Sequence, residues 1–115
     1  RLAYVFANYP EIEERVVYVN VGDSNVYQEK IDALLQSPDA EDYPDLIAAE
    51  AAYIMKYTNS DYTLPVADLG VTEADLAEMY PYTIQIATDQ RDGSLKGVSW
   101  QACPGSYMYR ILSNI

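Results

Sequence analysis

The sequence contains no histidine and a single cysteine in its 115 residues. Histidine is the commonest zinc ligand and the usual base in nucleophilic triads, so its absence argues against both kinds of site. One cysteine cannot form an internal disulfide, and we expect Cys103, with no histidine to deprotonate it, to be an inert small side chain. We therefore expect no catalytic residue, no metal and no cofactor, and predict that the chain is not an enzyme.

Basic residues and long apolar runs are also scarce. Only 7 Lys and Arg stand against 18 Asp and Glu, which gives a net charge of -11. Such a surface repels phosphate backbones, so nucleic acid is excluded as a favoured partner. The apolar runs fall far short of the roughly 20 residues that a membrane span needs. The first residues show neither a basic segment nor a long apolar run, so they contain no recognisable secretory signal.

Tyrosine is the aromatic residue that the sequence does have. It occurs 12 times, against one Trp and one Phe. A tyrosine ring combines a stacking face with a hydroxyl, which suits a binding surface. The alternative is that these rings fill half-buried positions of a small domain, and the sequence leaves both interpretations open.

The first half of the chain shows the pattern of a βαβ unit. Residues 2–9 carry apolar side chains at helical spacing until Pro10, and residues 15–21 form a β-branched run typical of a strand covered on both faces. A helix is predicted over residues 26–36, capped by Ser24 or Asn25, and a second buried strand over residues 45–50. The predicted fold class is α/β, with a small sheet of mainly parallel strands flanked by helices in one domain of residues 1–115.

The second half alternates short elements with turns. A capping-box pattern of Thr72 and Asp75 predicts the start of a helix, which Pro81 should break or kink. Residues 51–57 and 82–87 are also predicted to be helical. Extended structure is predicted at residues 64–70, 96–101 and 106–110, with a turn at residues 89–93.

Two candidate ligand residues follow the predicted strands. Asn25 lies in the loop after the first strand, and Glu50 comes directly after the second. The carboxyl ends of parallel strands meet at one edge of a sheet, where open α/β folds bind ligands. Paired polar side chains there suit the hydroxyls of a sugar. The alternative is that Asn25 helps to cap a helix and that Glu50 is a solvated carboxylate.

Trp100 and Gln101 are the other two candidates, at the end of the last predicted strand. An aromatic face packs against the apolar face of a pyranose, and a neighbouring amide can donate to and accept from its hydroxyls. A tryptophan in the core is the alternative at this position.

Four segments carry a resemblance to a known family, namely residues 27–35, 43–50, 64–70 and 95–110. Taken in order, these segments resemble the extracellular solute-binding proteins of carbohydrate ABC importers, the family 1 or maltose-binding-protein-like group. The resemblance covers about residues 6 to 110 in the family's order.

The resemblance implies part of the N-terminal lobe of a type II periplasmic-binding-protein fold. It implies capture of an oligosaccharide, an ABC permease as partner, and an extracellular lipoprotein tethered to the membrane. It assigns ligand contacts to Asn25, Glu50, Trp100 and Gln101. Relative to the family, the chain lacks the first strand and the second lobe, so we expect a truncated first lobe.

A missing first strand would leave an open sheet edge. Such an edge can pair with a second copy of the chain, so a homodimer is expected. The alternative function is therefore a stand-alone protein-interaction domain that self-associates through this edge.

Overall fold

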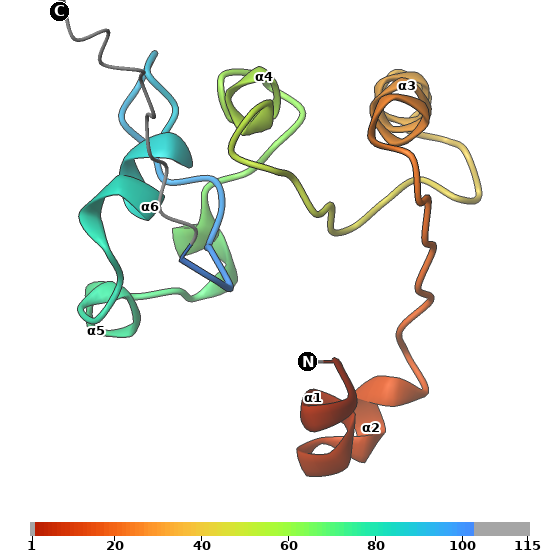
Figure 1. Cartoon of the computed structure of the whole chain (residues 1–115), viewed down its shortest axis with the longest axis horizontal. Coiled ribbons are helices and arrows are strands. Elements are labelled where there is room, and N and C mark those ends of the chain that lie inside the picture. The colour runs from red at the N-terminus through yellow and green to blue at the C-terminus, as the bar shows by residue number, and fades with distance from the viewer. Residues whose placement is uncertain (1, 103–115) are drawn as a thin grey trace, which may run out of the picture. The chain divides into compact units, whose positions relative to one another are not determined.

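The computed structural model describes residues 2–102, and it divides into two compact units, Arg1–Asp45 and Leu46–Ile115 (Figure 1). Apart from one isolated β-bridge, helices are the only regular secondary structure in the described residues. The predicted extended stretch at residues 106–110 and Cys103 lie outside them.

The first unit begins with two short helices separated by one residue. Helix α1 spans Leu2–Asn8 and α2 spans Pro10–Glu13. The helical spacing of the N-terminal apolar residues therefore predicted α1 correctly. Pro10 ends α1 because a proline has no backbone N–H to donate within a helix. It can start α2 because the N–H groups of the first helical turn have no partner inside the helix.

Helix α3 spans Ser24–Leu35 and is the longest helix in the described part of the chain. Its N-cap is Asp23, whose Oδ1 accepts hydrogen bonds from the backbone N–H groups of Asn25 at 2.9 Å and Val26 at 3.0 Å. The helix was predicted, but the expected cap at Ser24 or Asn25 is wrong by one or two residues. Ile31 and Leu35 are its buried side chains.

The described part of the second unit contains four short helical elements: α4 (Ile54–Thr58), η1 (Val66–Leu69), α5 (Glu73–Leu76) and α6 (Pro81–Ile86). The capping box at α5 is confirmed, because Oδ2 of Asp75 accepts from the backbone N–H of Thr72 at 2.8 Å. Pro81 was predicted to break or kink the helix that begins after Thr72, but that helix already ends at Leu76, and Pro81 starts the next helix, α6. Part of the predicted extended segment is a 3-10 helix, closed by Gly70 with a left-handed φ of 87°.

The predicted parallel sheet is wrong. Across residues 2–102 the sole β pairing is an isolated antiparallel bridge between Thr88 and Leu95, and Figure 1 shows no strand arrow. The predicted strands at residues 15–21, 45–50 and 96–101 do not form. An α/β fold of the periplasmic-binding-protein kind is therefore not supported.

Two physical reasons account for this error. The β-branched run at residues 16–21 does keep a non-helical backbone. A strand, however, also needs a neighbouring strand, because the β propensity of these residues comes mainly from packing against cross-strand neighbours. The second predicted strand includes two alanines, which are depleted in strands. It ends where the backbone carbonyl of Glu50 accepts from the N–H groups of Tyr53 and Ile54, which turns the chain toward α4.

The helices are short. No helix within the described region is long and apolar enough to span a bilayer.

Candidate functional site

A tight turn follows α6 and makes contacts with earlier residues of the second unit. The chain passes Ala87 and Thr88, reverses through residues 89–94 and returns at Leu95. The N–H of Asp89 donates to the carbonyl of Ser94 at 2.8 Å, and the N–H of Lys96 donates to that of Ala87 at 2.9 Å. The predicted turn at residues 89–93 is therefore confirmed.

An ion-pair cluster centred on the buried pair of Asp89 and Lys96 lies at this turn, and its other cation, Arg91, is half-exposed. Asp89 is 0% exposed, and its Oδ2 accepts from Lys96 Nζ and from Arg91 Nη2, each at 2.8 Å. Hydrogen bonds from the side chain of Arg91, and to a lesser extent from that of Lys96, hold the pKa of Asp89 far below its usual value. Hydrogen bonds to the carboxylate of Asp89, and to a lesser extent to that of Asp61, raise the pKa of Arg91. These contacts therefore favour the charged forms of Asp89 and Arg91.

The cluster also joins the turn to the chain that follows α4. Lys96 Nζ donates to the carbonyl of Ser60 at 2.8 Å, and Arg91 Nη2 lies 2.9 Å from Oδ1 of Asp61. Close by, the N–H of Gln90 donates to Oδ1 of Asn59 at 2.8 Å. Each of these contacts joins residues at least thirty positions apart in the sequence, and together they fix the start of the segment that leads to Trp100.

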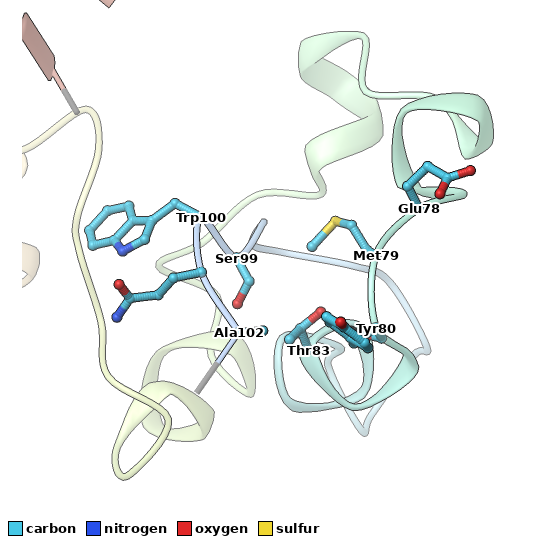
Figure 2. A pocket seen from close by; sticks show the side chains of 8 residues that line it. Glu78, Met79, Tyr80, Thr83, Ser99, Trp100 and Ala102 are labelled. Atoms are coloured by element: carbon cyan, nitrogen blue, oxygen red, sulfur yellow. Dashed lines mark hydrogen bonds between the residues drawn. The ribbon is translucent and has the colours of Figure 1, made fainter. Parts of the chain in front are cut away.

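A shallow pocket of about 180 Å³ lies beside that segment. Its volume is below the roughly 300–1,000 Å³ of small-molecule sites, so it can enclose only part of a ligand. One wall comes from the end of the described chain, and the other from the residues just before α6 and from α6 itself (Figure 2). The lining residues are Glu78, Met79, Tyr80, Thr83, Ser99, Trp100, Gln101 and Ala102.

Trp100 and Gln101, both predicted ligand residues, are brought together at this pocket. The indole is 67% exposed, which excludes a tryptophan of the core. Figure 2 shows the Trp100 ring pointing away from Met79 and Tyr80 on the opposite wall, and Gln101 lines the pocket next to it in sequence. The two side chains thus offer an aromatic face and an amide next to each other at the edge of the pocket.

Sequence reasoning missed the opposite wall. Tyr80 is 63% exposed and stacks on Tyr82 with ring centroids 6.2 Å apart. The Thr83 hydroxyl donates to the Tyr80 carbonyl at 2.7 Å, which fixes the start of α6. Pro81 between the two tyrosines was the available signal, because a proline at a helix start places the preceding residue outside the helix.

The other two predicted ligand residues do not line the pocket. Asn25 lies in the first turn of α3, in the first unit, and its backbone N–H donates to Asp23. Glu50 is exposed in the second unit, and its carbonyl accepts the two N–H groups that precede and begin α4. Their roles as ligand contacts stay predictions.

No group of three or more His, Cys, Asp or Glu side chains within residues 2–102 is arranged to hold a metal ion. The pocket instead offers hydroxyls, an amide and aromatic rings. These groups can form hydrogen bonds and stacking contacts with a polar, uncharged ligand.

We find no match to the chain among protein-family models, curated proteins or solved structures.

Proposed function

We propose that the chain captures a carbohydrate, as part of the solute-binding component of an ABC importer. The exposed indole of Trp100 beside the Gln101 amide carries the proposal, because the two groups suit the apolar face and the hydroxyls of one sugar ring. The order of the segments that resemble carbohydrate-binding proteins supports it from the sequence. The partner in this role would be a permease, and the location extracellular.

The charge of the chain favours a neutral sugar. A net charge of -11 repels anionic ligands, and Glu78 adds a carboxylate at the pocket. Since the pocket encloses only part of a ligand, we expect weak binding to this chain, with a Kd of about 1 mM.

Trp100 provides its own reporter, because it is the only tryptophan in the sequence. Titration with maltotriose, cellotriose and xylotriose should change its fluorescence saturably for at least one sugar. The same sugar should give a heat in calorimetry, which Trp100→Ala removes and Gln101→Ala reduces.

Tyr62 supplies a matched control. It is an exposed aromatic residue of the same unit that does not line the pocket, so Tyr62→Ala should leave the heat unchanged. The proposal fails if no neutral oligosaccharide gives a saturable signal with a folded chain, or if Tyr62→Ala and Trp100→Ala reduce the heat equally.

A further inference from the structure

Residues 16–22 connect α2 to α3 as an extended, exposed segment (Figure 1). Val17 is 90% exposed and Val19 57%. The backbone N–H and C=O groups of residues 17–22 form no hydrogen bond within the described chain. A β-branched segment with a row of unpaired backbone groups is a template for pairing with another strand.

We propose that residues 17–21 pair with the same segment of a second copy of this chain. Arg15, whose N–H donates to the Ile12 carbonyl in the turn after α2, and Asp23 flank the paired residues. The two segments form an antiparallel two-stranded ribbon centred on Val19. This surface differs from the expected open edge of a parallel sheet, which is not formed among the residues described, and it does not depend on the proposed sugar site.

Charge complementarity identifies the second copy as the partner. With Val19 opposite itself, Arg15 lies opposite Asp23 of the second copy, and the twofold symmetry repeats this pair at the other end. Opposite charges facing each other across an antiparallel pair are stabilising. Asp23 has the extended backbone that pairing requires, with φ -101° and ψ 126°, while it caps α3.

The residues between the two ion pairs match as well. Because side chains alternate across a strand, Val17, Val19 and Val21 share one face with the charged ends, and Val17 faces Val21 of the second copy. On the other face Tyr18 lies opposite Asn20. Each copy therefore contributes three valines to one apolar stripe, closed at both ends by an ion pair.

Other registers lose this match. A shift by one residue places Arg15 opposite Gly22 or Ser24, neither of which is charged. Parallel pairing in register places Arg15 beside Arg15 and Asp23 beside Asp23, and like charges facing each other are destabilising. The pattern thus selects the antiparallel arrangement centred on Val19.

A two-stranded ribbon is only marginally stable in water, so we expect a weak, concentration-dependent dimer. Analytical ultracentrifugation of the whole chain over a wide concentration range measures it. Arg15→Asp replaces two attractive pairs by two repulsive ones and should weaken dimerisation at least about tenfold. Lys30→Asp makes the same change in charge on the exposed surface of α3 and should leave dimerisation unchanged.

Two further variants make the test specific. Adding Asp23→Asn to Arg15→Asp removes the repulsion and keeps a good helix cap, so part of the lost association should return. Val19→Pro removes a backbone donor at the centre and should abolish the dimer. Circular dichroism checks that each variant remains folded.

The proposal is overturned by a wild-type chain that is monomeric at every concentration. It is equally overturned if Lys30→Asp weakens the dimer as much as Arg15→Asp does, if Asp23→Asn restores nothing, or if Val19→Pro has no effect. None of these results bears on sugar binding, which is measured separately at Trp100.

Discussion

The ammonium of Lys96 lies 2.8 Å from Oδ2 of Asp89, and both side chains are buried in the second unit. The same ammonium reaches the carbonyl of Ser60, thirty-six residues earlier in the chain. A buried charge requires a partner, because leaving water costs it several kcal/mol. This contact therefore links the turn after α6 to the end of α4 and supports the segment that carries Trp100.

Removing either partner of this pair should destabilise the protein strongly. Asp89→Asn leaves the Lys96 charge buried, and Lys96→Met leaves the carboxylate with Arg91 alone. Each variant should lower the melting temperature by roughly 10 °C or more. The double variant should lose less than the sum of the two, because no buried charge then lacks its partner. Calorimetric melting of all four proteins checks this, and additive losses would show that the pair is not coupled.

Stability should fall in acid because the pKa of Asp89 is depressed. The unfolded chain takes up this proton near its ordinary pKa of about 4, whereas the folded chain holds the carboxylate ionised to a much lower pH. The contribution of Asp89 is therefore complete well above pH 4 and is lost progressively as the pH falls below it. Urea unfolding from pH 7 to pH 3 measures the slope.

The Asp89→Asn variant provides the comparison for this acid slope. It should lose less stability per unit of pH below about pH 4 than the wild-type chain does. Some slope should remain, because hydrogen bonds from Thr72 and Ser94 also lower the pKa values of Asp75 and Asp92. Identical slopes for the two proteins would contradict the ion pair in solution.

Gly70 and Gly22 form a matched pair that isolates backbone strain. An added Cβ meets nothing within 4 Å at either position, but only Gly70 has a left-handed backbone, with φ 87°. Gly70→Ala should cost about 1 kcal/mol of unfolding free energy, whereas Gly22→Ala should be neutral or slightly stabilising. Denaturant unfolding measures both, and equal effects would argue against the left-handed cap of η1.

Thr58 and Thr83 form a second matched pair, since both are 3% exposed. The Thr58 hydroxyl has no hydrogen-bond partner in the described structure, while the Thr83 hydroxyl donates to Tyr80. Thr58→Val should therefore be neutral or stabilise by up to about 1 kcal/mol, and Thr83→Val should destabilise by about 1 kcal/mol. A loss at Thr58 as large as that at Thr83 would show that its hydroxyl is satisfied in solution.

The sequence predicted elements whose cause is local. The capping box at Thr72 depends on Asp75 three residues away, and the turn at residues 89–93 depends on its own glycine and polar residues. The apolar spacing of α3 likewise places Ile31 and Leu35 on a single buried face. In each case the hydrogen bonds and dihedral angles are set within one or two turns of chain.

The absence of the sheet and one wall of the candidate site could not be predicted from local patterns. Residues 16–21 have the composition of a strand, but pairing requires a partner that composition does not supply. Trp100 and Gln101 share the pocket as sequence neighbours, whereas Tyr80 and Thr83 come from a part of the chain about twenty residues earlier that only the fold brings to the same pocket.

The sequence by itself determined the acidic charge, the absence of histidine, the short helices and the turn, because these depend on composition and on neighbouring residues. Only the tertiary structure decided that Asp89 is buried against Lys96, that Trp100 stands exposed beside a pocket, and that residues 17–22 form no backbone hydrogen bond with any other described residue. Burial and pairing are contacts between distant parts of the chain, and local preferences do not specify which distant residues meet.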